Sequence, residues 1–158
     1  MAVTDDEAAT LRYYTRQHCS RQWMHFLAAM FAEFEERVDP AEADQFLETI
    51  GARIGRALPL RRCESLEELT GEVNAVLEGI EWGWARISEA DQYISITHGA
   101  YPVVPQDEGR RTWLVPVLEG LYTEWLGEQG GDPSLSARLA DNRRVAGTPL
   151  VFYYGRHD

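Results

Sequence analysis

Four histidines and two cysteines are the residues of this chain best suited to proton transfer or metal binding. His18 and His25 lie seven residues apart, two turns along a predicted helix, and no third ligand is near them in the sequence. Cys19 and Cys63 belong to neither a CxxC pair nor a Cys/His cluster with metal-binding spacing. We therefore predict no metal site and two separate reduced thiols.

Sequence motifs for catalysis are missing as well. The chain has no GxSxG nucleophile elbow, no GxGxxG dinucleotide fingerprint and no phosphate-binding loop. His98 and His157 have no evident partner, so we expect each to be exposed or held in a structural hydrogen bond. The glutamates at 33–36 and 67–68 are expected on solvated helix faces. The prediction is a chain that is not an enzyme, with no catalytic residue and no cofactor.

Charge and length restrict the possible partners. The 158 residues carry a net charge of −11 at pH 7. Nucleic-acid grooves and sites for anionic membranes need clustered Lys and Arg, so neither is expected. No run of about 18 apolar residues could span a membrane, and the acidic start MAVTDDEAAT does not resemble a secretory signal. We expect a single domain over residues 1–158, located in the cytoplasm.

Aromatic residues remain as candidates for binding. The chain has five tryptophans and seven tyrosines. Sugar rings stack on such flat apolar side chains, and a neutral polysaccharide would suit an acidic protein. Most tryptophans of so small a domain nevertheless fill its core, and this is the interpretation that the sequence favours.

These residues must be positioned by helices and strands, and residues 112–127 are the clearest helix. Their apolar residues recur in pairs every four positions, which predicts a helix packed against the core. Pro116 fits within the first turn, and Gly120 would let another backbone approach closely. Glu119 and Thr123 are expected on the outer face.

Three further helices are predicted before it. Thr4 opens a capping box at the start of a long helix over 4–37, whose second half carries the aromatic residues expected in the core. Capping boxes at Asp39 and Ser65 begin helices over 40–58 and 66–80. Gly51 and Gly55 form a GxxxG spacing, which in this context indicates a close helix crossing.

Four strands complete the expected fold. Alternating or β-branched residues predict strands at 82–87, 93–98, 136–141 and 150–154, with a hairpin turn at 89–92 between the first two. The order is α-α-α-β-β-α-β-β. We expect an α+β fold in which about four helices pack with a four-stranded antiparallel sheet, the helix 4–37 preceding the rest of the core at 40–158.

Several of these segments resemble one known family. They are VNAVL at 73–77, IEWG at 80–83, SEADQ at 88–92 and, most specifically, TWLVPVLEGLYTEW at 112–125. Together they are similar to the cellulose synthase D-subunit family of bacterial cellulose operons. The resemblance runs from about residue 51 to residue 131.

The resemblance implies a non-enzymatic accessory subunit of cellulose export, near the synthase complex of the inner membrane. The family forms a ring-shaped homo-octamer, a tetramer of dimers, that is associated with nascent β-1,4-glucan chains and orders the export terminals for crystalline cellulose. Implied partners are other subunits of the complex and a proline-rich protein. The family's glucan passages are attributed to its amino-terminal region. Here the polar first half of the first helix, with Arg12, Tyr13 and Arg16, is the expected contact with glucan or a neighbouring subunit.

A second interpretation stays open. The order of elements also resembles vinyl-reductase-like domains that sense small apolar molecules. That function would need an apolar pocket lined by the helix at 112–127 and the first helix. Copurifying ligand or zinc would favour it.

Overall fold

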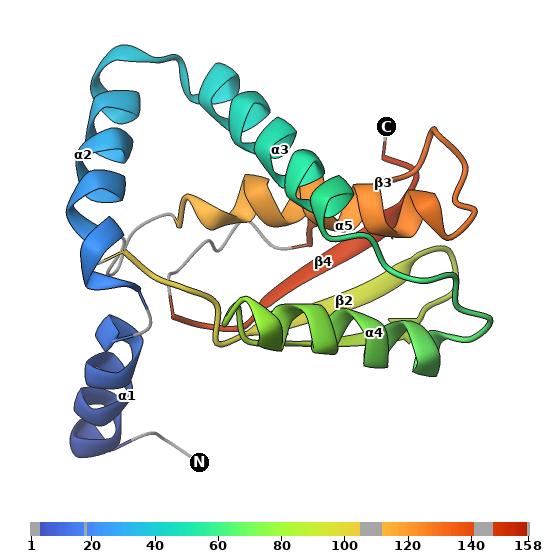
Figure 1. The fold of residues 1–158 in the computed structure, drawn as a ribbon, viewed down its shortest axis with the longest axis horizontal. Helices are drawn as coiled ribbons and strands as arrows, with labels where there is room; N and C mark the ends of the chain where they lie inside the picture. Colours follow the sequence, from blue (N-terminus) through green and yellow to red (C-terminus); the bar gives the residue numbers. More distant parts are fainter. Residues whose placement is uncertain (1–3, 18, 105–111, 141–146, 158) are drawn as a thin grey trace.

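A four-stranded antiparallel sheet supports the helices in the computed structural model of the chain (Figure 1). The structure describes residues 4–17, 19–104, 112–140 and 147–157. The helices are α1 (Asp5–Gln17), α2 (Arg21–Arg37), α3 (Pro40–Ala57), α4 (Leu66–Gly79) and α5 (Leu114–Glu128), and the strands are β1 (Trp84–Glu89), β2 (Ile94–Gly99), β3 (Ser136–Leu139) and β4 (Leu150–Gly155).

The predicted α+β class and the order of elements are confirmed, with two local corrections. The helix expected over 4–37 is two helices, because Ser20 has φ −55° and ψ 128°, outside the helical region, and α2 begins after it. The first strand begins at Trp84 and not at Trp82, because the Trp82 amide bonds to the Leu77 carbonyl at 2.8 Å and completes the end of α4.

The strands lie in the order β1-β2-β4-β3, and one face of the sheet is covered by helices. Alternate strand residues point to that face and are buried, with Ile96 and Phe152 fully inaccessible to solvent. They form one cluster with residues of both α4 and α5, including Val73 and Leu121. Both helices therefore pack on the same face of the sheet.

Helix α5 is buried on nearly all sides because it lies between the sheet and α3. The predicted close crossing is confirmed: a Cβ added to Gly51 would lie 1.8 Å from the Val117 carbonyl oxygen, and one on Gly120 would lie 1.9 Å from that of Glu48. Only glycine permits backbones to approach so closely. Trp125 then fixes the end of α3 by donating from Nε1 to the Leu58 carbonyl at 2.9 Å.

Side chains from the helices occupy outward backbone groups on both edge strands. On β1, the Asn74 side-chain amide accepts from the Ala85 backbone amide and donates to the Ala85 carbonyl, each at 2.8 Å. On β3, Thr123 and Glu119 accept from the amides of Ala137 and Leu139, each at 2.9 Å. Bonds of this kind hinder another strand from adding at these positions.

The prediction that Glu119 lies on the outer face is therefore wrong. Its side chain is buried, 8% of the residue being exposed, and its second oxygen lies 3.8 Å from the Arg138 guanidinium. A glutamate can be buried here because an edge-strand amide and a cation both stabilise its charge.

Candidate functional site

The amino-terminal arm, which we define as α1 and α2 (residues 5–37), stands beside the rest of the molecule (Figure 1). Its start is the predicted capping box: the Thr4 amide donates to the Glu7 carboxylate at 2.9 Å and the Glu7 amide donates to the Thr4 hydroxyl at 3.2 Å. This box lowers the pKa of the Glu7 carboxyl, chiefly through the bond from the Thr4 backbone.

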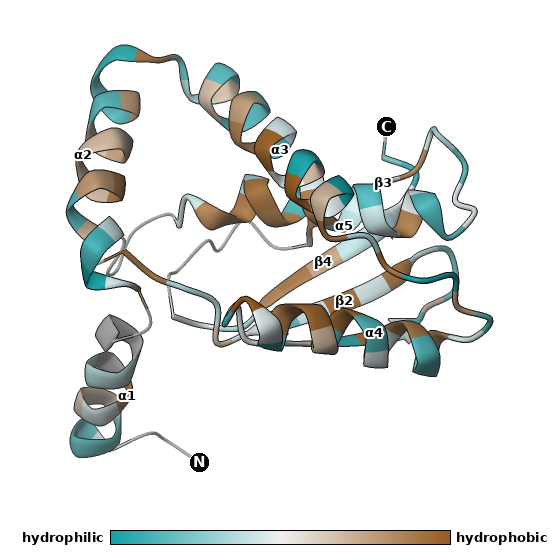
Figure 2. Ribbon diagram, viewed as in Figure 1, coloured by the Kyte–Doolittle hydropathy of each residue, from teal (hydrophilic) through white to brown (hydrophobic). Residues whose placement is uncertain are grey.

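Large apolar side chains are exposed on both helices of the arm, between residues 11 and 26. Their exposed fractions lie between 59% and 62%, and they are Leu11, Tyr13, Tyr14, Trp23 and Phe26. Tyr13 and Tyr14 meet edge to face with ring centroids 5.8 Å apart, and Trp23 and Phe26 do so at 6.0 Å. Figure 2 shows that α2 carries hydrophobic residues although this helix lies away from the sheet. A patch of this kind marks an interaction surface.

The predicted contact residues fall on this arm with different outcomes. Tyr13 is exposed, as an interaction residue must be. The side chains of Arg12 and Arg16 lie outside the described part of the structure. The structure tests none of the three as a contact with glucan or a subunit.

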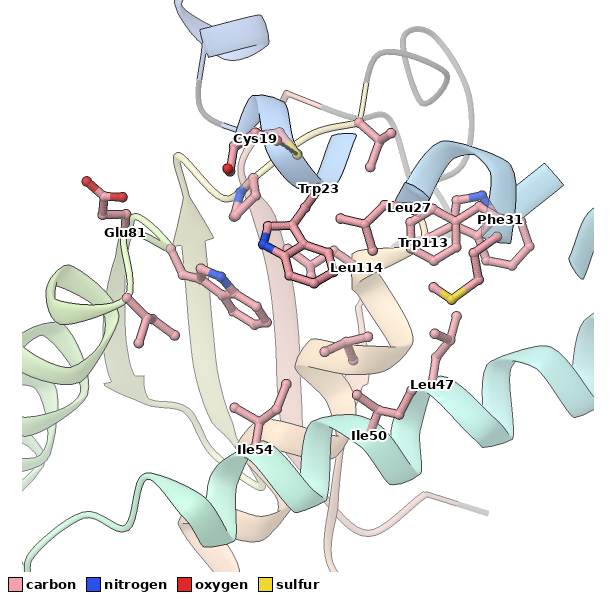
Figure 3. A pocket seen from close by; sticks show the side chains of 17 residues that line it. Cys19, Trp23, Leu27, Phe31, Leu47, Ile50, Ile54, Glu81, Trp113 and Leu114 are labelled. Carbon is pink, nitrogen blue, oxygen red and sulfur yellow. Dashed lines mark hydrogen bonds between the residues drawn. The ribbon is translucent and has the colours of Figure 1, made fainter. Parts of the chain in front are cut away.

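An apolar groove of about 400 Å³ separates the arm from α3 and α5. Figure 3 shows side chains from the three helices directed into one space, which we call the arm groove. Its lining is mainly apolar, with Ser20 and Glu81 as polar members, and includes Trp23, Leu27, Met30 and Phe31 from α2, Leu47, Ile50 and Ile54 from α3, and Trp113, Leu114 and Val117 at the start of α5. A space of this size and character can accept an apolar molecule or the apolar face of a helix.

Aromatic contacts join the arm to the body of the protein at the groove and next to it. Phe31 stacks on Trp113 with ring centroids 5.1 Å apart and ring planes at 3°, and Phe34 meets Phe46 edge to face at 5.8 Å. These rings hold the second half of α2 against α3 and α5. The expectation that this half is anchored in the core is wrong for Trp23 and Phe26, which are mainly exposed, and Phe31 and Phe34 are half-buried against other rings outside the hydrophobic core.

The one fully buried histidine among the described residues, His98, is structural. Its Nε2 lies 2.8 Å from the Trp82 carbonyl, which can only accept, so Nε2 carries the proton. Its Nδ1 then accepts from the Tyr122 hydroxyl at 2.6 Å. Burial lowers the pKa of His98 to about 4, although the bond to Trp82 acts in the other direction. A neutral imidazole with both nitrogens occupied is poorly placed to transfer protons to a substrate.

The remaining thiols and imidazoles do not converge. In the described ranges there is no group of three or more His, Cys, Asp or Glu residues that could hold a metal ion. Burial raises the pKa of the Cys19 and Cys63 thiols, and both are free. His157 lies near the carboxyl terminus, with Nε2 3.0 Å from the Ser136 carbonyl. His18 lies outside the described residues.

The exposure of Trp23 was not predicted from the sequence, and an apolar pocket between the first helix and the helix at 112–127 was named only as a requirement of the sensor interpretation. The usable signal is the polar run at residues 17–21, Gln-His-Cys-Ser-Arg, which spans the junction between α1 and α2. A helix that begins at residue 21 can turn its aromatic face away from the body. In the part of the chain that the structure describes, no helix is long and apolar enough to reach across a lipid bilayer.

Comparison with known proteins gives a consistent result. A family model that describes the D subunit of cellulose synthase matches residues 9–152. Cellulose synthase operon protein D from Komagataeibacter xylinus is 33% identical over 109 residues, covering 67% of this chain and 70% of that protein. The protein of the same description from Komagataeibacter sucrofermentans is 31% identical over 109 residues, with the same coverage. These matches do not favour the vinyl-reductase-like sensor, although the arm groove has the apolar lining that such a sensor would need.

Proposed function

The chain belongs to the cellulose synthase D-subunit family and is thus involved in bacterial cellulose synthesis, and from this premise we propose that it is a non-enzymatic, self-assembling scaffold of the synthase complex. In this proposal it forms a ring-like homo-octamer, a tetramer of dimers, on the cytoplasmic side of the inner-membrane complex. The ring organises the export terminals and the nascent β-1,4-glucan chains for crystalline cellulose. Other synthase subunits and a proline-rich protein are its proposed partners.

The exposed aromatic arm is the observation that carries the proposal. Large apolar side chains that are about 60% exposed lose contact with water when another surface covers them, and each fully covered side chain contributes about 1.5–3 kcal/mol. The arm groove beside them offers a complementary apolar surface for a second copy. We propose that Tyr13, with Arg12 and Arg16 on the same helix, contacts either a neighbouring subunit or glucan.

A second feature supports assembly through helices. The sheet edges are partly occupied by Asn74, Thr123 and Glu119, so addition of another subunit's strand is hindered. In the described part of the arm, by contrast, large apolar side chains are exposed. Assembly through the arm is therefore the route that the structure favours.

The experiment is a native-mass measurement by light scattering at micromolar concentration. Eight subunits of 18.0 kDa give 144 kDa. We expect the full chain near this mass and a variant lacking residues 1–17 at a lower mass, with a similar thermal midpoint because α1 adds little to the core. Asp6→Ser on the same helix is the matched control for Tyr13→Ser, and only the tyrosine variant should shift the mass. A monomeric full chain would contradict the scaffold.

A further inference from the structure

The face of the sheet that points away from α4 and α5 carries its own pattern of side chains. We define as the outer sheet face its part on β1, β2 and β4, formed by Trp84, Arg86, Ser88, Ser95, Thr97, Val151 and Tyr153, together with Tyr93, whose ring contacts Tyr153. These residues alternate with the buried ones and are exposed or half-buried. None of the eight is a carboxylate, although the chain has 26 acidic residues.

The strand register arranges these side chains in rows across the sheet. Ser88 is paired with Ser95, which is paired with Tyr153. The next row runs from Arg86 through Thr97 to Val151. In the last row Trp84 is paired with Gly99. Hydroxyl groups and one guanidinium therefore lie between aromatic rings at two ends of the face.

The aromatic ring at the first end lies against the backbone of the neighbouring strand. A Cβ on Gly99 would be 2.4 Å from Cζ2 of Trp84, so the indole rests directly on the Gly99 backbone. Trp84 remains 39% exposed, and the Arg86 guanidinium carbon lies 5.7 Å from the indole ring centroid. The indole is thus held by the Gly99 backbone, and the Arg86 guanidinium lies over its ring as a cation–π partner and hydrogen-bond donor.

At the other end, Tyr93 and Tyr153 form a second platform. Their ring centroids are 4.1 Å apart with the planes at 33°. Trp84 and Ser88 are four residues apart on β1, which is about 14 Å along the strand, and β1 and β4 are about 10 Å apart across β2. The two platforms are thus separated by more than the width of a single sugar ring.

We propose that the outer sheet face is a second binding surface for a β-1,4-glucan chain, separate from the arm. This rests on the proposed association with glucan and adds the residues that would hold an extended segment: Trp84 stacks on one pyranose ring, Tyr153 on another, and Thr97 and Arg86 bond to hydroxyls between them. The polymer is uncharged and rich in hydroxyls, as the surface requires.

Other occupants fit this surface less well. A protein interface has an apolar centre and a polar rim, whereas here the centre is polar and the aromatic rings are at the ends. A nucleic acid would need several cations on this face. Among its eight residues Arg86 is the cation, and Arg138, which is paired with Tyr153 on the neighbouring strand, bonds to Glu48 at 2.8 Å.

The test measures cellohexaose and cellobiose binding to the full chain by calorimetry. We expect Trp84→Ala and Tyr153→Ala each to weaken cellohexaose binding at least about fivefold, because each loses one stacking platform. The loss should be smaller for cellobiose, which is too short to reach both platforms. Trp84→Phe should restore most of the affinity. Glu89→Ala, on the same strand but outside the outer sheet face, is the matched control and should bind as the wild type does.

The outcomes separate this inference from the proposed function. If both alanine variants bind cellohexaose as the wild type does and deletion of residues 1–17 removes binding, the outer-face site is overturned and the arm is the glucan contact. A fall in native mass in Trp84→Ala would identify the face as a subunit contact and also overturn the inference. Absence of cellohexaose binding by the wild type would overturn both glucan assignments, while the native mass still tests the scaffold. Two variants at opposite ends keep the test valid if one of them does not fold.

Discussion

Acidification should destabilise this protein through His98 before most of its carboxylates titrate. His98 is fully buried, and its ring lies between the Tyr122 hydroxyl and the Trp82 carbonyl. Burial disfavours the imidazolium and lowers the pKa from 6.5 to about 4, and it also raises the pKa of the Tyr122 phenol. The native state therefore keeps His98 neutral at pH values where the unfolded chain binds a proton.

The size of the effect follows from linkage between protonation and folding. The folded pKa is below the unfolded one, so the contribution is fully present above pH 6.5 and is lost as the pH falls towards 4. A shift from 6.5 to about 4 corresponds to about 3 kcal/mol over the full range, at about 1.4 kcal/mol per pH unit. Between pH 7.5 and pH 5 the free energy of unfolding should fall by about 2 kcal/mol because of this residue.

Urea denaturation followed by tryptophan fluorescence, at one fixed protein concentration, measures this loss. His98→Gln removes the titrating group but keeps donor and acceptor atoms, and it shares every other titrating residue with the wild type. The wild type should therefore lose about 2 kcal/mol more than His98→Gln between pH 7.5 and pH 5. Tyr122→Phe leaves His98 buried but removes the hydroxyl that donates to the neutral ring, so it should lower overall stability and show a smaller pH-dependent loss than the wild type. Equal losses in the wild type and in His98→Gln would refute the reasoning.

Two predictions concern packing and the sheet edge. Gly51→Ala should lower the free energy of unfolding by about 3 kcal/mol, because its Cβ would overlap a carbonyl of α5. Gly71 lies on α4, where an added Cβ would meet nothing within 4 Å, so Gly71→Ala should raise the free energy of unfolding by about 0.5–1 kcal/mol. Similar losses in both variants would contradict the close crossing of α3 and α5. Asn74→Ala should cost about 2 kcal/mol and speed hydrogen exchange at the Ala85 amide, since both edge bonds are lost. Unchanged exchange at Ala85 would show that Asn74 does not protect this edge.

The sequence determined the features that depend on neighbours along the chain. Capping residues such as Thr4 and Ser65 predicted where helices begin, because a side chain bonds to an amide only a few residues away. Apolar pairs every four residues predicted α5, and alternation predicted the strands. The glycines at 51 and 120 indicated a close crossing because they lie among bulky residues on strongly helical segments. The motif TWLVPVLEGLYTEW carried the family resemblance.

The tertiary structure decided what each side chain faces. Trp125 and Trp84 are alike in the sequence, yet one is fully buried under α3 and the other lies on the open side of the sheet. Glu119 and His98 were indistinguishable from surface residues until the fold brought an edge-strand amide to one and a tyrosine hydroxyl to the other. Burial and hydrogen bonding of this kind join residues that are 20 or more positions apart, as Glu119 and Leu139 are. Such contacts leave no periodic signal along the chain, so only the folded arrangement determines them.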